Sequence, residues 1–335
     1  MRILITGGCG FIGSHTCVEL QNAGFDVVIA DNLSNSKEEV VDNIAKITGK
    51  RPDFIKADLS NEEQCNKVFD TFTDIEGIIN FAAYKAVGES MQKPIEYYKN
   101  NLGILLNVMD NMKRKNINYF VQSSSCTVYG EPDELPIKES APIKDATSTY
   151  GHTKQIVEQM LGFITSSTNI RAIALRYFNP IGAHPTALIG ELPNGVPNNL
   201  LPFITQTAAG IRKELVVFGN DYPTPDGTCI RDYIHVVDLA KAHVVAINRL
   251  IEKKNKKALE FFNIGTGRGY SVLEIINSFE KTTGQKLNWR FGPRREGDII
   301  KIWADTTFAK EELGWQAKED IDSMTSSAWK WQQTL

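Results

Sequence analysis

The chain has 335 residues, of which 42% are hydrophobic and 23% are charged. This length and composition suit one large or two closely joined globular domains with a sizeable core. The formal net charge of −3 argues against an overall positive surface that would attract nucleic acid or anionic lipid. Any anionic ligand must therefore be bound by cationic side chains near its own site.

The cysteines argue against both a disulfide framework and a zinc site, because their number is odd and none forms a C-x-x-C pair. They are Cys9, Cys17, Cys65, Cys126 and Cys229. The apolar N-terminal stretch breaks at Gly7, too early for a signal peptide, and no later run reaches membrane-spanning length. We therefore expect a soluble, cytoplasmic protein with reduced thiols and no bound metal.

A glycine-rich loop follows the first predicted strand. Residues 2–6 are a short apolar run typical of a buried parallel strand, and a helical stretch reaches about residue 23. Between them, Gly7, Gly10 and Gly13 permit a tight turn, close approach to a pyrophosphate and close helix packing, while the helix N-terminus faces the anion. With Phe11 and Ile12, this loop is a candidate dinucleotide-binding site.

The second predicted strand, residues 26–30, leads into Asp31. A carboxylate at this position can accept hydrogen bonds from the adenosine ribose, and it repels a 2′-phosphate, which favours NAD over NADP. The alternative is a carboxylate that only caps the loop. Asn32, Asn35 and Ser36 lie in the polar turn that follows and are candidates for the same ribose.

The alternation of strand and helix continues along the first half of the chain. Further strands are expected at 54–57, 77–81, 119–123 and 171–176, with helices reaching about residue 48, at 94–116 and at 150–166. Right-handed crossovers make this pattern an α/β fold, a doubly wound parallel sheet of the Rossmann type that binds ligands at the carboxyl ends of its strands. The other candidate cofactor residues are Asp58, Leu59, Phe81, Ala82, Ala83, Lys85, Asn100 and Phe178.

Tyr150 and Lys154 lie four residues apart on a predicted helix and therefore share one face. A cation beside a phenol favours phenolate, so we expect Lys154 to lower the pKa of Tyr150 from about 10 toward neutrality. Such a tyrosine can accept the proton of an alcohol that is being oxidised. Ser125, near the end of a predicted strand, is a third candidate catalytic residue; the alternative is a serine that only bonds backbone.

The composition changes after residue 176. Residues 177–225 are rich in Pro, Gly and Asn, with one helix at 200–210 and one strand at 215–218. A helix at 236–250 and a strand at 261–264 return to the first domain, and Ser271 caps a helix to about residue 283. We expect an NAD-binding domain of residues 1–176 plus about 236–266, and a smaller C-terminal substrate-binding domain of about 177–235 plus 267–335.

Motifs from residue 1 to about residue 331 extend these observations. They lie at 6–13, 31–33, 85–90, 123–130, 150–154, 176–180, 197–200, 227–236 and 294–298. Together they resemble the motifs of the UDP-glucose 4-epimerases, which belong to the extended short-chain dehydrogenase/reductase family. The glycine loop and the Tyr/Lys pair mark only the superfamily, whereas the substrate-side motifs are far more specific.

This resemblance implies an isomerase that interconverts UDP-galactose and UDP-glucose with tightly bound NAD, in a homodimer built from the helices after the fourth and fifth strands. Tyr150 would take the proton of the sugar 4-hydroxyl while carbon 4 gives its hydride to NAD. Lys154 would bind the nicotinamide ribose and Ser125 the 4-oxygen. The residues implied for the UDP-sugar are Asn179, Asn199, Leu200, Phe218, Arg231, Arg295, Asp298 and Ile302.

Individual positions keep alternatives open. Arg231 could pair with its neighbour Asp232 instead of the diphosphate, Arg294 is expected in a structural pair, and Cys126 is expected to pack. Ile302 stands where relatives often have a tyrosine that walls the sugar pocket, so we hypothesise partial access for UDP-N-acetylglucosamine.

Two rival functions are weaker. A nucleotide-sugar 4,6-dehydratase would need a carboxylate beside Ser125, and the following residues offer none. A non-catalytic NAD-binding regulator would not need Tyr150, Lys154 and the two arginines together.

Overall fold

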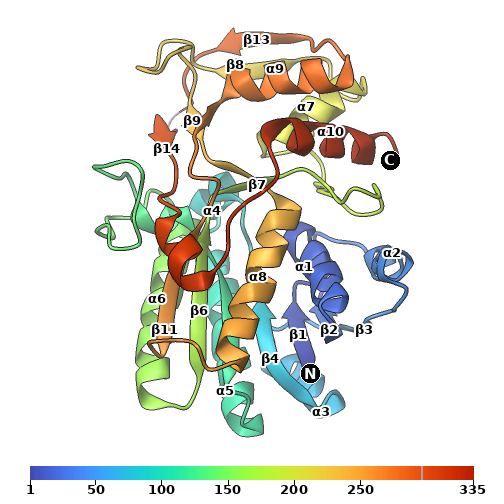
Figure 1. Cartoon of the computed structure of the whole chain (residues 1–335), viewed down its shortest axis with the longest axis vertical. Helices are drawn as coiled ribbons and strands as arrows, with labels where there is room; N and C mark the ends of the chain where they lie inside the picture. The colour runs from blue at the N-terminus through green and yellow to red at the C-terminus, as the bar shows by residue number, and fades with distance from the viewer. Residues whose placement is uncertain (296) are drawn as a thin grey trace.

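A seven-stranded parallel sheet forms the centre of the computed structural model, which describes residues 1–295 and 297–335 (Figure 1). The strands run in the order β11-β6-β5-β4-β1-β2-β3, and every pairing is parallel. They are β1 (Arg2–Thr6), β2 (Asp26–Asp31), β3 (Asp53–Lys56), β4 (Ile75–Asn80), β5 (Tyr119–Ser125), β6 (Arg171–Tyr177) and β11 (Leu259–Ile264). The predicted doubly wound fold is confirmed.

Helices bury both faces of this sheet. Ile3 and Ile5 of β1 pack with α1 (Phe11–Asn22), α2 (Glu39–Thr48) and α8 (Val236–Ile251), while Leu4 packs toward α3 (Glu62–Thr71), α5 (Pro94–Lys115) and α6 (Thr149–Ser167). Successive side chains of a strand point to opposite faces, so a strand covered on both sides is apolar throughout. This explains why residues 2–6 show no alternation.

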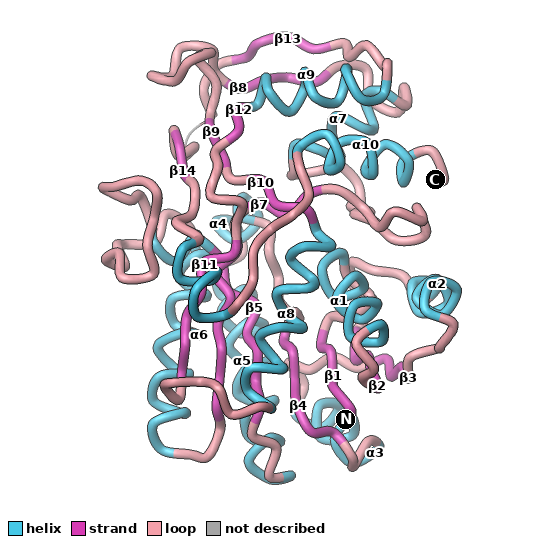
Figure 2. Tube along the Cα trace, viewed as in Figure 1, coloured by secondary structure: helices cyan, strands magenta, loops and turns pink. Residues whose placement is uncertain are grey.

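A smaller part of the chain lies beyond the carboxyl ends of the sheet, at the top of Figure 2. Its helices are α7 (Leu200–Ala208), α9 (Val272–Thr283) and α10 (Ile321–Gln332). Its strands are β7 (Asn179–Ile181), β8 (Leu215–Phe218), β9 (Ile230–Arg231), β10 (Tyr233–His235), β12 (Tyr270–Ser271), β13 (Trp289–Gly292) and β14 (Lys301–Ile302). The predicted Ser271 cap is confirmed, as a capping box with Glu274.

One segment departs from the expected division of the chain. The π-helical turn η2 (Ala309–Leu313) and Trp315 pack in the core that contains α1 and α8, and the Trp315 indole donates to the carbonyl of Asp238 at 3.2 Å. The sequence placed these residues with the substrate-binding part. We therefore propose that residues 309–315 belong with the NAD-binding part, and the remaining boundaries stay as proposed from the sequence.

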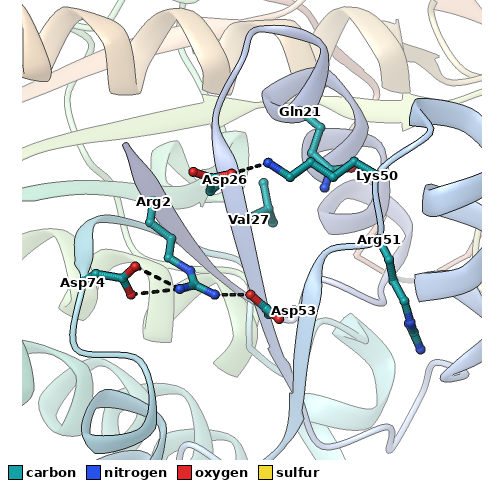
Figure 3. Close-up of a pocket in the computed structure, with 8 residues that line it drawn as sticks. All are labelled: Arg2, Gln21, Asp26, Val27, Lys50, Arg51, Asp53 and Asp74. Atoms are coloured by element: carbon teal, nitrogen blue, oxygen red, sulfur yellow. Dashed lines mark hydrogen bonds and ion pairs between the residues drawn. The ribbon is translucent and has the colours of Figure 1, made fainter.

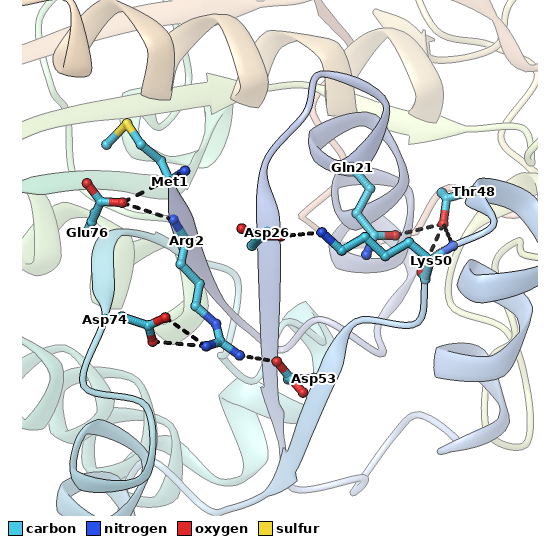
Figure 4. Close-up of polar contacts among 9 residues, drawn as sticks. All are labelled: Met1, Arg2, Gln21, Asp26, Thr48, Lys50, Asp53, Asp74 and Glu76. Carbon is cyan, nitrogen blue, oxygen red and sulfur yellow. Dashed lines mark hydrogen bonds and ion pairs between the residues drawn. The ribbon is translucent and has the colours of Figure 1, made fainter.

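Ion pairs join the amino-terminal ends of the central strands, at the edge away from the smaller part. The Arg2 guanidinium contacts both Asp53 and Asp74, and Lys50 contacts Asp26 (Figure 3). The backbone N–H of Arg2 also donates to Glu76 at 3.3 Å (Figure 4). These side chains line a shallow pocket, and its positive and negative groups pair with one another. We therefore assign the pocket a structural role.

Within the described residues, no helix combines the length and the apolar character needed to cross a bilayer. All five cysteines are buried and unpaired.

Candidate active site

The glycine-rich loop joins β1 to α1 and lies against the residues that follow β4. Gly7 has a φ of +69°, and a Cβ added there would lie 2.9 Å from the backbone nitrogen of Ala82. A Cβ on Gly13 would lie 2.3 Å from the carbonyl oxygen of Gly7. Both positions therefore require glycine. Gly10 is the N-cap of α1 and provides no side-chain cap, so the first N–H groups of the helix, at Phe11 and Ile12, are available to an anion.

Asp31 ties the glycine loop to the end of β2. Its carboxylate accepts hydrogen bonds from the backbone N–H of Cys9 at 3.0 Å, the N–H of Leu33 at 2.9 Å and the hydroxyl of Ser36 at 2.9 Å. The capping interpretation and the ribose interpretation are compatible, because a carboxylate has about four lone-pair sites. Asn32 lies in the same turn, whereas Asn35 is exposed.

The remaining cofactor candidates follow β3, β4 and β6 or lie in α5. The centre of the Phe81 ring lies 4.7 Å from that of the tilted His243 ring, the backbone N–H of Ala82 donates to the Thr6 hydroxyl at 3.2 Å, and Asp58 accepts from Ser60. The others are Leu59 and Phe178, which are buried, Ala83, which is half-buried, and Asn100, which is buried and donates to Asn101 at 2.9 Å.

Lys85 differs from the other cofactor candidates because it forms an ion pair with a residue of the substrate side. Its ammonium lies 3.5 Å from the carboxylate of Glu191, which also accepts a hydrogen bond from the Asn199 amide at 2.6 Å. Glu191 thus connects a predicted cofactor residue to a predicted substrate residue. Sequence reasoning missed it, because an isolated glutamate in a turn-rich stretch carries no signal of its own.

Tyr150 and Lys154 share one face of α6, as predicted from their spacing. The Lys154 ammonium lies 5.7 Å from the centre of the Tyr150 ring and donates to the carbonyl of Ser123 at 2.7 Å. The backbone N–H of Tyr150 is in the first turn of the helix and donates to the hydroxyl of Ser90, 3.1 Å away. Ser90 comes from α4 (Val87–Gln92), so a second element fixes the start of α6.

The expected lowering of the Tyr150 pKa is not what the structure gives. Desolvation raises the pKa of Tyr150 above its usual range, and the neighbouring Ser125 only partly opposes this rise. Burial also lowers the pKa of Lys154, to about 8. The prediction erred because it counted the attraction between cation and phenolate but not the cost of removing both groups from water.

Ser125 is the last residue of β5 and the N-cap of the 3-10 turn η1 (Cys126–Tyr129). Its hydroxyl oxygen accepts from the backbone N–H of Thr127 at 3.2 Å, so the backbone role foreseen as the alternative is present. The hydroxyl proton stays free to act on another group, because this bond uses only an oxygen lone pair. Cys126 is buried in a small cluster with Phe178 and Ile302, in agreement with the expectation that it packs.

Two arginines and one carboxylate meet on the substrate side. Arg231 in β9 lies 3.8 Å from Asp298, and Arg295 contacts the same carboxylate at 2.6 Å. Asp232 accepts instead from the backbone N–H groups of Thr266, Gly267 and Ala304, so the alternative Arg231–Asp232 pair is wrong. Arg294 pairs with Asp221 at 2.7 Å, which confirms the expected structural pair. Glu296 of this motif lies outside the described residues.

The other predicted substrate residues come from several elements of the smaller part. Phe218 ends β8 and is 43% exposed, with the Arg295 guanidinium 5.6 Å from the centre of its ring. Asn199 is the N-cap of α7, and Leu200 is the first residue of that helix. Asn179 begins β7, and Ile302 ends β14. Within residues 1–295 and 297–335, no three His, Cys, Asp or Glu side chains form a group that could hold a metal.

Comparison with known proteins shows which enzyme family the chain resembles. Residues 3–265 match the model of the NAD dependent epimerase/dehydratase family. A UDP-glucose 4-epimerase from Bacillus subtilis is 49% identical over 333 residues, which are 99% of this chain and 97% of that protein.

Solved structures agree with this result. A UDP-glucose 4-epimerase from Stenotrophomonas maltophila with bound NAD and formylated UDP-arabinopyranose has a TM-score of 0.96 at 45% identity, covering 100% of this chain and 98% of that one. A UDP-glucose 4-epimerase from Bifidobacterium longum in complex with NAD+ and UDP has a TM-score of 0.94 at 45% identity, with the same coverage.

Proposed function

The chain belongs to the NAD dependent epimerase/dehydratase family, and we propose that it interconverts UDP-galactose and UDP-glucose by inverting carbon 4 of the sugar. NAD is the cofactor of this isomerase. One observation carries the proposal: Tyr150 and Lys154 share a face of α6 beside the end of β5, in a chain similar to UDP-glucose 4-epimerases along nearly its whole length.

The loop after β1 fits a dinucleotide. A side chain on Gly7 or Gly13 would clash with the backbone of Ala82 or of Gly7, so only glycine permits this tight turn, and the N-terminus of α1 is not capped by a side chain. Asp31 stands at the end of the neighbouring strand, where a ribose would lie. Residues Gly7, Gly10, Gly13 and Asp31 would therefore hold the adenosine half of NAD.

When bound, NAD would supply reversible hydride transfer at carbon 4 of the sugar. Tyr150, as the phenolate, would accept the proton of the 4-hydroxyl, so that carbon 4 can become a ketone. Lys154 stabilises the phenolate, and Ser125 donates to the 4-oxygen. At the end of the reaction Tyr150 would return the proton to the 4-oxygen, so the base finishes as it began.

The cations on the substrate side would hold the nucleotide while the keto sugar turns over. Arg231 and Arg295 are separated by 64 positions in sequence (295 − 231) yet contact one carboxylate, so their guanidinium groups converge. Forked guanidinium groups suit diphosphate oxygens, and Asp298 between them would accept from the uridine ribose. Phe218 offers an exposed ring for the uracil.

A homodimer built from α5 and α6 is part of the proposal. These helices pack side by side on one face of the sheet, and both leave large apolar side chains in solvent: Phe163 is 80% exposed, Ile95 64% and Leu106 52%. Large apolar side chains that neighbouring helices leave in solvent are typical of interaction surfaces. We also propose a cytoplasmic location, supported by five cysteines that are all unpaired.

The test mixes purified protein, without added NAD, with UDP-galactose and resolves the products. We expect UDP-glucose to form, because a cofactor that starts and ends oxidised has no need to leave. Protein that retains NAD but leaves UDP-galactose unchanged would contradict the substrate assignment. Protein that is inert until NAD is added would contradict tight retention of the cofactor.

A further inference from the structure

The site contains a buried charge that the proposed chemistry does not use. Glu158 lies one helical turn beyond Lys154 on α6, on the face that also carries Tyr150. Its carboxylate accepts from the Ser124 hydroxyl at 2.6 Å and from Arg176 at 2.9 and 2.6 Å. The side chains of Glu158 and Arg176 are 7% and 5% exposed.

Two consecutive residues of β5 contact this face of α6. The Ser123 carbonyl accepts from Lys154, and the Ser124 hydroxyl donates to Glu158. The end of β5 therefore fixes Lys154 and Glu158 together. A shift of Glu158 along the helix face would break a contact to the strand that also carries Ser125.

Arg176 is held on its other sides as firmly as Glu158. Arg176 lies in β6, beside β5, where it is the register partner of Ser124. Its guanidinium carbon lies over the ring of Phe261, 4.4 Å from the ring centre. It also donates to the Tyr129 hydroxyl at 3.0 Å, and that hydroxyl donates to Asn263 at 2.7 Å. The carboxylate of Glu158 is thus fixed by a network that reaches β6, η1 and β11.

We propose that Glu158 is a positioning residue of the site, whose fixed negative charge keeps the neighbouring Lys154 ammonium protonated. The inference rests on the roles proposed above for Tyr150 and Lys154. It adds a reason why a lysine 4% exposed to solvent can still serve as a cation.

The electrostatics around Lys154 support this assignment. Burial lowers the pKa of Lys154 and the charge of Glu158 partly opposes this, which leaves the pKa at about 8. Tyr150 is the base of the proposed reaction, whereas burial raises the pKa of the neighbouring Tyr177, Tyr129 and Tyr97 and of the Cys126 thiol, so these groups are neutral near neutral pH. Among the described groups packed against this face, Glu158 and Arg176 therefore carry the fixed charges.

Two substitutions break the same ion pair but change the field at Lys154 in opposite directions. Glu158→Gln removes the negative charge and leaves Arg176. Arg176→Met removes the positive charge and leaves Glu158. Ser124→Ala removes one hydrogen bond without changing any charge, and it serves as the control.

The measurement follows the protonation of Lys154 directly, by NMR of protein labelled with ¹³C at lysine Cε, where Lys154→Met identifies the resonance. We expect the titration midpoint to fall by about one pH unit or more in Glu158→Gln. We expect no fall in Arg176→Met and no change in Ser124→Ala. The basic limb of the pH profile for UDP-galactose turnover should move with the midpoint.

A midpoint that falls equally in Glu158→Gln and Arg176→Met, or in neither, would overturn the inference. If either single variant fails to fold, the double variant Glu158→Gln with Arg176→Met leaves no unpaired charge and should still show the lowered midpoint. An unsubstituted protein that titrates as expected but does not convert UDP-galactose would count against the proposed function, not against the charge coupling.

Discussion

The Lys154 ammonium lies 5.7 Å from the centre of the Tyr150 ring, one helical turn away on α6. This arrangement makes Tyr150→Phe the most direct test of the proposed base. We expect a loss of turnover of about 10²- to 10⁴-fold, the usual contribution of a positioned acid–base group, with bound NAD retained. Tyr119→Phe, at the opposite end of β5, is the matched control and should keep its activity. Equal activity in both variants would remove Tyr150 from the reaction.

Asp31 should hold the cofactor partly by holding the glycine loop. Asp31→Asn replaces the oxygen acceptors of three hydrogen bonds by one oxygen and one N–H donor, next to the backbone N–H of Cys9. Because hydrogen bonds to charged groups contribute about 1.5–3 kcal/mol, we expect the purified variant to lose most of its NAD. Absorbance of the denatured supernatant measures this directly. Asp26→Asn, at the other end of β2, should keep its NAD.

Ile302 should decide how large a sugar enters. The residue is 3% exposed and belongs to a buried cluster with Cys126 and Phe178, next to the proposed sugar site. We expect slow conversion of UDP-N-acetylgalactosamine by the unsubstituted protein and faster conversion by Ile302→Gly, with UDP-galactose turnover as the reference in both. Undetectable conversion of the N-acetylated sugar by both proteins would exclude Ile302 as the limiting wall.

The apolar side chains of α5 and α6 should mediate self-association. Leu106→Glu places a charge in the proposed dimer interface, which excludes water. We therefore expect the variant to shift from dimer to monomer, as measured by light scattering after size-exclusion chromatography. Ile211→Glu is the control, because Ile211 is 63% exposed but lies after α7, far along the chain from either helix. A parent protein that is monomeric at micromolar concentration would contradict the proposal.

Buried histidines should make the protein sensitive to acid. Burial lowers the pKa of His243 to about 4, and its Nδ1 faces the Leu239 carbonyl at 2.9 Å. Because the folded pKa is below the unfolded value of about 6.5, this contribution is complete above about pH 6.5 and is lost as the pH falls toward 4. The full effect is on the order of 3 kcal/mol in the free energy of unfolding.

Urea titrations between pH 4 and 7 measure this effect. His243→Phe keeps a ring against Phe81 and removes the titrating group, so we expect a flatter dependence of the unfolding free energy on pH. A variant whose unfolding free energy depends on pH as steeply as that of the parent would assign the sensitivity to other groups.

The first half of the fold could be predicted from local pattern alone. Each strand of the sheet except β11 is followed by a helix or turn with its own signal, and the predicted ends were within about two residues of the observed ones for β1 to β6 and for β11. The strands of the smaller part escaped prediction, with the exception of β8. β9, β12 and β14 have two residues each, and such short segments become strands only because their partners lie beside them.

The site could be predicted in part for the same reason. Tyr150 and Lys154 are close because a helix dictates it, whereas the pairing of Glu158 with Arg176 depends on how α6 packs on β6. The pKa of Tyr150 depends on desolvation, which no spacing in the sequence reveals. The Lys85–Glu191 pair joins residues over 100 positions apart and needed the fold to be seen.

The position of β11 has a consequence for synthesis of the chain. β6 ends at Tyr177, but the strand that completes its outer side is supplied by residues 259–264. While the intervening residues leave the ribosome, β6 presents an open row of backbone N–H and C=O groups, and the apolar face that α8 later covers is bare. Unpaired edges are templates for wrong pairing. We expect fragments that end before residue 259 to accumulate in aggregates, and nascent chains of this length to depend on chaperones.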